Sequence, residues 1–540
     1  MSNVLAVTII AVLSASGVSG PNAPPAADAC AGLAQLELQG AKVMSADVVS
    51  AGGFAPPAGM SPWMAGDPSF YKTLPAFCRL VVKATPSADS EIGIEVWMPV
   101  ERWNGKFRGQ GNGGFAGEID FRSMGGAVSR GYATAGTNTG HSAGGTDATW
   151  ALGHPEKVTD FGYRAIHVMT QIAKAAIQAH YGRAVQHAYF GSCSNGGRQA
   201  LMEAQRFPAD YDGILAGAPA NFWTHLLAKA LADAQATSLE AASYIPSRKI
   251  PAIAKAVNAA CDGQDGVVDG VINDPRQCHF DPATLLCKDG DSDACLTASQ
   301  AAALSALYRG PHDAGGREIF PGYLPGAEDG EGGWGPWITG PEPGQSLLFA
   351  FGTGYFGNMV YQKPGWDYRA VSVEQALKAA EEKTREKLDA TDADLSPFKA
   401  RGGKLILYHG WNDPAISALN TIHYYDSVVS RLGRPETDGF VRLYMVPGMQ
   451  HCGGGPGPSS FGQFGVATSD DPQHNALAAL EKWVEASQAP STLIATKHVD
   501  DNPSKGVLKT RPLCPYPQTA VYKGQGDPND AANFACSPPK

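Results

Sequence analysis

Short apolar runs rich in β-branched residues alternate with helical patterns along most of this chain. The strand-like runs lie at residues 80–82, 92–97, 132–135, 187–190, 213–215, 404–408 and 440–446. Helical periodicity is clearest at residues 163–181, 196–206 and 476–486. Strands that alternate with helices predict an α/β fold whose sheet is mostly parallel.

The pattern changes between residues 221 and 392. An alanine-rich helical stretch is followed there by a segment rich in Cys, Asp and Gly, and then by one rich in Gly and aromatic residues. Strand patterns resume only at Lys404. We therefore interpret residues 221–392 as an insertion into an α/β core made of residues 28–220 and 393–540.

Composition limits the possible classes of protein. Hydrophobic residues make up 43% of the 540 and charged residues only 17%, which excludes a charge-rich disordered chain and a coiled coil. Lys and Arg number 42 against 52 Asp and Glu, so the net charge is −10, and no long basic run is present. We therefore expect neither a nucleic acid nor a membrane as a partner.

The N-terminus and the cysteines both bear on the compartment. Residues 1–20 contain an apolar run from Val4 to Val18 that is too short to span a bilayer and has the size of a signal-peptide core, although no Lys or Arg precedes it. The ten cysteines form no CxxC motif, and their even number fits disulfides in a secreted or periplasmic protein. The alternative is a cytosolic protein with scattered buried thiols.

A serine stands in the turn between a predicted strand and a predicted helix. The turn, residues 191–197, reads GSCSNGG. Small residues two positions before and after Ser194 are what a nucleophile elbow requires, and the helix N-terminus would stabilise developing negative charge. Ser194 is therefore the candidate nucleophile. Ser192 stands where the usual pattern has Gly, so a Gly/Ser-rich loop without chemistry is an equal alternative on this motif alone.

Two later loops carry a candidate acid and a candidate base. Asp413 and His451 each follow a predicted strand, and the order Ser, acid, His is that of α/β-hydrolases. His451 would take the Ser194 proton and deliver it to the leaving alcohol, while Asp413 would orient the imidazole. Of thirteen histidines, His409 and His141 also lie near strand ends and are the rival candidates for the base.

An oxyanion hole needs two backbone N–H groups aimed at one point. Asn195, directly after the candidate nucleophile, would supply one of them. The other would come from the glycine-rich loop at residues 109–115, in which Gly113 and Gly114 are the candidates. The alternative is that these glycines only form a turn.

Three carboxylates stand among glycines within the insertion, at Asp262, Asp265 and Asp269. Their spacing suits a hard cation bound by oxygen ligands, with backbone carbonyls in the remaining positions. The segment is not an EF-hand, since Gln264 and Gly266 occupy ligand positions and the closing Glu is absent. On composition alone, a solvated acidic turn is an equal alternative.

Taken together, these segments resemble the tannase and feruloyl esterase family of α/β-hydrolases. The resemblance is carried by Cys193-Ser194, Asp413 and His451-Cys452, and by the surrounding residues 103–105, 111–115, 160–165, 193–197 and 211–220. The family implies an α/β-hydrolase core with a lid inserted between the Ser and Asp segments, which corresponds here to residues 221–392. The mono-hydroxyethyl terephthalate hydrolases are similar in architecture.

The resemblance also implies disulfides and a metal site. Cys193 would pair with Cys452, next to the candidate triad. By adjacency and by the family pattern, the other expected pairs are Cys30–Cys78, Cys261–Cys278, Cys287–Cys295 and Cys514–Cys536. A structural calcium ion is implied, with side-chain ligands from Asp262, Asp265 and Asp269 and carbonyl ligands from Val267 and Val271.

The leading hypothesis is a secreted serine esterase that hydrolyses galloyl, feruloyl or related hydroxycinnamoyl and benzoyl esters through an acyl-enzyme. A terephthalate half-ester is a further candidate substrate. Aromatic residues of the insertion would either line the acid's pocket or form the insertion's own core, namely Trp334, Trp337, Phe351, Tyr355 and Phe356. The alternative functions are a catalytically silent binding protein with this fold and an acyltransferase that uses the same triad.

Overall fold

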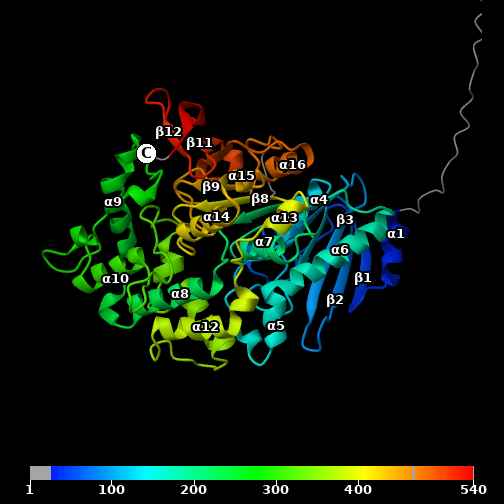
Figure 1. Cartoon of the computed structure of the whole chain (residues 1–540), viewed down its shortest axis with the longest axis horizontal. Helices are drawn as coiled ribbons and strands as arrows, with labels where there is room; N and C mark the ends of the chain where they lie inside the picture. The colour runs from blue at the N-terminus through cyan, green and yellow to red at the C-terminus, as the bar shows by residue number, and fades with distance from the viewer. Residues whose placement is uncertain (1–25, 465–468, 539–540) are drawn as a thin grey trace, which may run out of the picture.

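The computed structural model describes residues 26–464 and 469–538, so the predicted signal peptide at residues 1–20 lies outside the described part. At its centre is a nine-stranded sheet in the order β1-β2-β3-β5-β4-β6-β7-β8-β9 (Figure 1). The strands are β1 (Ala41–Val49), β2 (Phe77–Ala84), β3 (Ile92–Pro99), β4 (Lys106–Gln110), β5 (Ala133–Thr137), β6 (His187–Cys193), β7 (Gly213–Gly217), β8 (Lys404–Gly410) and β9 (Val441–Val446). The six strands from β5 to β9 are parallel, and β1, β2, β3 and β5 pair antiparallel. The predicted α/β fold is confirmed.

All seven strand-like runs of the sequence fall on strands of this sheet. The edge strand β1 was not predicted, because Lys42, Ser45 and Asp47 interrupt its apolar residues and most of the strand is only partly buried. Four strands in the C-terminal segment were also missed. They form two antiparallel hairpins, β10 (Leu493–His498) with β11 (Val507–Leu513) and β12 (Thr519–Tyr522) with β13 (Phe534–Ser537).

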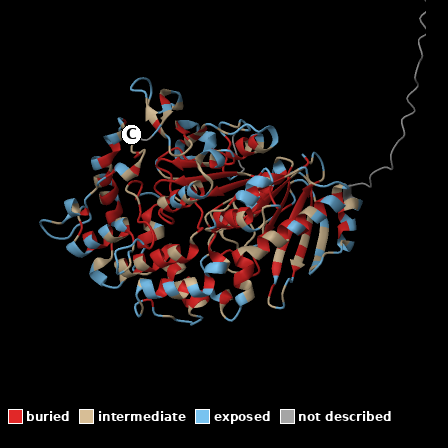
Figure 2. Ribbon diagram, in the orientation of Figure 1, coloured by how far each residue is buried: buried red, intermediate tan, exposed pale blue. Residues whose placement is uncertain are grey.

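Helices cover both faces of the sheet, since alternate side chains of each buried strand point to opposite sides. On β8, Leu405 and Leu407 pack into one core cluster, whereas Ile406 and Tyr408 pack into another. The first face is covered by α6 (Ala165–Tyr181), α7 (Asn195–Arg206) and α14 (Ala418–Leu432), and the second by α4 (Phe121–Ser129) and α16 (Ala476–Ala486). Figure 2 shows the central strands almost entirely buried between these layers. The remaining helices around the core are α1 (Ala26–Gly32), α2 (Pro62–Ala65), α3 (Pro68–Tyr71), α5 (Pro155–Thr159), α13 (Ser396–Ala400) and α15 (Arg434–Asp438).

The chain between β7 and β8 forms a helical insertion with a hydrophobic core of its own. Its helices are α8 (Trp223–Ser238), α9 (Ile250–Cys261), α10 (Ala298–Arg309), α11 (Leu347–Gly354) and α12 (Val373–Leu388). In Figure 1 the insertion is green to yellow and lies to the left of the sheet and below it. Its core also includes Phe115 from the glycine-rich loop and Ile416 from the loop after β8. The insertion therefore packs directly against two loops that carry candidate site residues.

All five expected disulfides are present, and no cysteine of the described residues is free. The pairs are Cys30–Cys78, Cys193–Cys452, Cys261–Cys278, Cys287–Cys295 and Cys514–Cys536. No helix in the described part of the chain is long and apolar enough to cross a membrane.

Candidate active site

Ser194 occupies a strained turn between β6 and α7. Its backbone has φ +66° and ψ −125°, a conformation that residues with a side chain rarely adopt. The turn is held by hydrogen bonds, since Ser194 N donates to Gly217 O at 2.9 Å and Ser194 O accepts from Ala220 N at 3.1 Å. A strained backbone at one partly exposed serine, maintained by the surrounding hydrogen bonds, is what a nucleophile elbow requires.

The glycines after Ser194 are required by close packing. A Cβ atom at Gly196 would lie 1.9 Å from Ser192 Oγ, and a Cβ atom at Gly197 would lie 2.2 Å from Gly217 O. The side chain of Ser192 therefore fills the space beside Gly196, which explains how this turn accommodates Ser where the usual pattern has Gly.

Asp413 and His451 come together at the ends of β8 and β9. His451 Nδ1 donates to Asp413 Oδ2 at 2.8 Å, and Asp413 Oδ1 accepts from Ala415 N at 2.8 Å and Ile416 N at 2.9 Å. Burial by itself raises the pKa of Asp413, but the charge of His451 and the hydrogen bonds from His409 and His451 outweigh it and hold that pKa well below its usual range. The carboxylate is thus ionised and points one oxygen at His451.

His451 meets the requirements for a base, and its two rivals do not. Its Nδ1 binds Asp413, and its side chain is 10% exposed. Among the described residues nothing hydrogen-bonds to Nε2, so this nitrogen is available to a reacting group. His409 is fully buried, with hydrogen bonds at both ring nitrogens. His141 Nε2 donates to Phe115 O at 2.8 Å, and burial lowers the pKa of His141 to about 4.

A disulfide connects the candidate nucleophile to the candidate base. Cys193, which precedes Ser194, is bonded to Cys452, which follows His451, and their Cα atoms are 6.0 Å apart. Within the described residues no hydrogen bond joins the Ser194 and His451 side chains. The covalent bridge is therefore the direct link between the two loops.

The glycine-rich loop lies against the first turn of α7. Asn112 N donates to Gln199 Oε1 at 3.1 Å, and Gln199 Nε2 donates to Asn112 Oδ1 at 2.8 Å. Among the described residues, the backbone N–H groups of Asn195, Gly113 and Gly114 donate to no protein acceptor. These N–H groups are thus free to bind a negatively charged oxygen.

Arg198 fixes the residue that follows Ser194. Its guanidinium is fully buried and donates to Asn195 Oδ1 from Nε at 2.9 Å and from Nη2 at 2.7 Å. It also donates to the carbonyls of Phe161 and Gly162, at 3.0 and 2.7 Å. Sequence reasoning missed Arg198, Asn112 and Gln199, because each acts through a partner that only the fold brings close.

An aromatic arc runs from the glycine-rich loop to His451. The Phe115 and Phe351 rings meet edge to face at 5.1 Å, Phe351 stacks on Trp337 at 6.4 Å, and Trp337 meets the His451 ring edge to face at 4.8 Å. Trp337 comes from the π-helical turn η9 (Gly335–Thr339) and Phe351 from α11, both in the insertion. Of the five predicted aromatics these two are partly exposed, whereas the other three are buried in the insertion's core, namely Trp334, Tyr355 and Phe356.

The three carboxylates of the insertion share one loop after α9. Both Asp262 oxygens accept from Gly270 N, at 3.1 and 3.0 Å, and Asp265 Oδ1 accepts from Val267 N at 3.0 Å. Burial, together with the charges of Asp269 and Asp262, raises the pKa of Asp265 to about 6. A cation at this loop would relieve that repulsion.

Two backbone carbonyls of the same loop are available as ligands. Val267 and Val271 are buried, and in the described part of the chain neither carbonyl accepts a protein hydrogen bond. Asp269 Oδ2 also accepts from Lys509 Nζ at 3.2 Å and Arg511 Nη2 at 2.6 Å, which ties the loop to β11. Oxygen donors are the type that a hard cation such as calcium prefers, but the ligand oxygens of Asp262, Asp265 and Asp269 do not all lie within 4.8 Å of one another in this structure.

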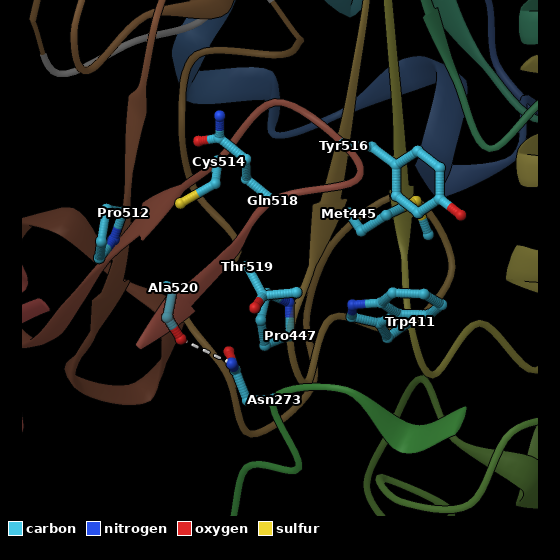
Figure 3. A pocket seen from close by; sticks show the side chains of 10 residues that line it. All are labelled: Asn273, Trp411, Met445, Pro447, Pro512, Cys514, Tyr516, Gln518, Thr519 and Ala520. Carbon is cyan, nitrogen blue, oxygen red and sulfur yellow. Dashed lines mark hydrogen bonds between the residues drawn. The ribbon is translucent and has the colours of Figure 1, made fainter. Parts of the chain in front are cut away.

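A small hollow lies elsewhere, between β9 and the C-terminal hairpins (Figure 3). Its volume is about 10 Å³, and Asn273 Nδ2 donates to Ala520 O at 2.7 Å on its wall. This space has room for about one water molecule and is too small for an ester substrate.

A serine in a strained strand-to-helix turn of a mostly parallel sheet defines an α/β-hydrolase. The tannase and feruloyl esterase family matches residues 78–537, and the chain belongs to that family. It is 44% identical over 538 residues to an uncharacterized esterase of Xanthomonas campestris, covering 95% of this chain and 91% of the relative. It is 34% identical to a probable feruloyl esterase B-2 of Aspergillus terreus, covering 85% of this chain and 86% of that relative.

Solved structures agree with this assignment. Feruloyl esterase B from Aspergillus oryzae has a TM-score of 0.86 at 29% identity, covering 95% of this chain and 100% of the other. Tannin acyl hydrolase from Aspergillus niger shares the fold, with a TM-score of 0.72 at 23% identity, covering 93% of this chain and 92% of the other. Family membership makes the chain a carboxylic ester hydrolase.

Proposed function

We propose that this chain is a secreted serine esterase that hydrolyses esters of aromatic carboxylic acids, of the galloyl, feruloyl, hydroxycinnamoyl or benzoyl type, through an acyl-enzyme at Ser194. The observation that carries the proposal is the connected set Ser194–Cys193–Cys452–His451–Asp413, in which a disulfide and a 2.8 Å hydrogen bond join three loops. The chain order Ser194, Asp413, His451 and the strained turn at Ser194 support the same roles of nucleophile, acid and base.

In the proposed mechanism, His451 Nε2 removes the Ser194 proton as Oγ attacks the ester carbonyl. Asp413 keeps the proton on Nδ1 and stabilises the imidazolium that forms. The free N–H groups of Asn195 and of Gly113 or Gly114 would bind the oxyanion. The proton on Nε2 then passes to the leaving alcohol, which departs and leaves the acyl group on Ser194. A water molecule attacks the acyl carbonyl while Nε2 takes its proton, and Nε2 returns that proton to Ser194 Oγ as the bond to the acyl group breaks and the acid leaves.

The aromatic arc supports an aromatic acid as the acyl group. Trp337 and Phe351 offer partly exposed ring faces between His451 and Phe115, where the acyl group would lie. Both belong to the insertion, and Gln450, next to His451, donates to the insertion carbonyls of Ala327 and Asp329, each at 2.8 Å. We propose that the insertion acts as a lid that forms one wall of the acid's pocket.

Calcium is proposed as a structural ion at the loop of Asp262, Asp265 and Asp269. When bound, it would neutralise the carboxylates and hold the loop between the insertion and β11, and it takes no part in the ester chemistry. Secretion is supported by the five disulfides, which persist in oxidising compartments.

A fluorophosphonate probe tests the nucleophile. We expect it to label the wild-type protein and the matched control Ser192→Ala, and to leave Ser194→Ala unlabelled. Hydrolysis of methyl gallate, methyl ferulate, chlorogenate and the terephthalate half-ester then identifies the acid. Labelling that persists in Ser194→Ala contradicts the proposal. Labelling without turnover of any ester indicates a silent hydrolase fold, and transfer to an added alcohol in preference to water indicates an acyltransferase.

A further inference from the structure

The Asp413 carboxylate is hydrogen-bonded to two imidazoles, and the proposed mechanism uses only that of His451. Asp413 Oδ2 accepts from His451 Nδ1 at 2.8 Å and from His409 Nε2 at 3.1 Å. The backbone N–H groups of Ala415 and Ile416 occupy only the other oxygen, Oδ1. His409 is fully buried at the end of β8 and cannot reach a substrate. Its ring can therefore influence the reaction only through Asp413.

The neighbours of His409 fix which ring nitrogen carries the hydrogen. Nε2 faces two acceptors, Asp413 Oδ2 and, at 3.0 Å, the carbonyl of Ile416, so Nε2 must be protonated. Nδ1 lies 2.7 Å from Thr421 Oγ1, whose hydroxyl can donate to it. The neutral Nε2–H tautomer thus satisfies both nitrogens, in a chain of donors that runs from Thr421 through His409 to Asp413.

We infer that His409 is a positioning residue of the esterase, whose Nε2–H holds Asp413 Oδ2 where it orients His451. This inference rests on the proposed function of Asp413 and His451. Two backbone N–H groups hold Oδ1 but leave the carboxylate free to turn about its last bond. The His409 hydrogen bond fixes Oδ2 as well, so that the His451 ring is aligned before substrate binds.

Asp413 Oδ2 has two imidazole donors, His451 Nδ1 and His409 Nε2. Without the His409 hydrogen bond, the His451 ring alone would hold this oxygen, and the carboxylate and that ring could turn together. From the insertion, the phenol of Tyr323 experiences the charge of Asp413 and donates to Asp233, which is paired with Lys229. Burial raises the pKa of Tyr323 well above its ordinary value, so this phenol stays neutral.

Two amide substitutions separate positioning from simple packing. The nitrogen of His409→Gln lies near the former Nε2 and can reach Asp413, whereas that of His409→Asn lies near the former Nδ1 and reaches only Thr421. We expect His409→Asn to lower kcat on the order of 100-fold with KM changed by less than about threefold, and His409→Gln to keep kcat within about tenfold of wild type.

Equal losses of kcat in the Gln and Asn variants, or a wild-type kcat in the Asn variant, would overturn the inference. Nitrogen NMR of the histidines in the wild-type protein gives a second test that needs neither substrate nor a variant. A protected Nε2–H tautomer at His409 is expected, and an Nδ1–H tautomer refutes the inference. If the tautomer is as expected but Asp413→Asn retains full esterase activity, the proposed function fails and not the His409 contact.

Discussion

Replacing Cys193 and Cys452 together by Ala is expected to abolish activity at a modest cost in stability. The bridge holds the residue before Ser194 next to the residue after His451, and among the side chains that the structure describes no hydrogen bond replaces it. Without the bridge, the loops after β6 and β9 are joined only through packing. A displacement of about 1 Å between a nucleophile and its base costs on the order of 100-fold in rate.

The stability cost follows from the 259-residue separation of the two cysteines. Loop-closure entropy for such a loop gives about 5.5 kcal/mol as an upper figure. Unfolding entropy of about 2.1 cal/mol/K per residue amounts to roughly 1.1 kcal/mol/K for this chain, so the Tm should fall by about 5 °C if the protein unfolds in one transition. Folded protein therefore remains abundant at 25 °C, and lost activity there reports geometry.

The pair Cys30–Cys78 provides the control. It closes 48 residues between α1 and β2, away from the site. The loop-closure free energy is about 4 kcal/mol as an upper figure, so the loss of this bridge should lower the Tm by about 4 °C. We expect kcat/KM at 25 °C to fall at least about 100-fold in Cys193→Ala/Cys452→Ala and to stay near wild type in Cys30→Ala/Cys78→Ala. Equal activity in the two double variants would refute the reasoning.

Two further predictions concern stability. A chelator should lower the Tm and added calcium should restore it, and Asp265→Asn should bind calcium more weakly. An unchanged Tm on adding or removing calcium, with no metal found by elemental analysis, would contradict the site. His141→Gln should make the stability of the protein less sensitive to acid. In the wild type the pKa of His141 is about 4 in the folded state against an ordinary 6.5, so the unfolded chain binds more protons between these pH values. The free energy of unfolding of the wild type should therefore fall by up to roughly 3 kcal/mol as pH falls from 6.5 to 4. The same loss between pH 6.5 and 4 in the variant and in the wild type, measured by denaturant unfolding, would count against this account.

The core strands were predictable because they are buried on both faces and read as continuous apolar runs. β6, β7 and β8 are of this kind. In β1 and in the C-terminal hairpins, exposed positions break the runs, so that local pattern alone does not separate them from loops. The insertion between β7 and β8 was recognisable only because strand patterns stop and resume.

Chain order and the local turn around Ser194 indicated the candidate nucleophile and acid, whereas three histidines remained candidates for the base. The residues that support these groups were not predicted. Gln199 hydrogen-bonds Asn112 across 87 residues, and Arg198 hydrogen-bonds the carbonyl of Leu388 in the insertion across 190. A single sequence shows the polar residue in each case and does not show its partner, since pairing over such separations is decided by how the sheet and the insertion pack.

The three strand-end histidines show what the sequence leaves undecided and why. Each follows or ends a strand beside the site, and the requirement that separates them is one free, accessible ring nitrogen. His451 keeps Nε2 free, whereas His409 uses both nitrogens to hold Asp413 and to bind Thr421. His141 holds the carbonyl of Phe115 at the end of the glycine-rich loop. The two rivals for the base therefore each fix a group that the base depends on, one the acid and the other the loop proposed to bind the oxyanion.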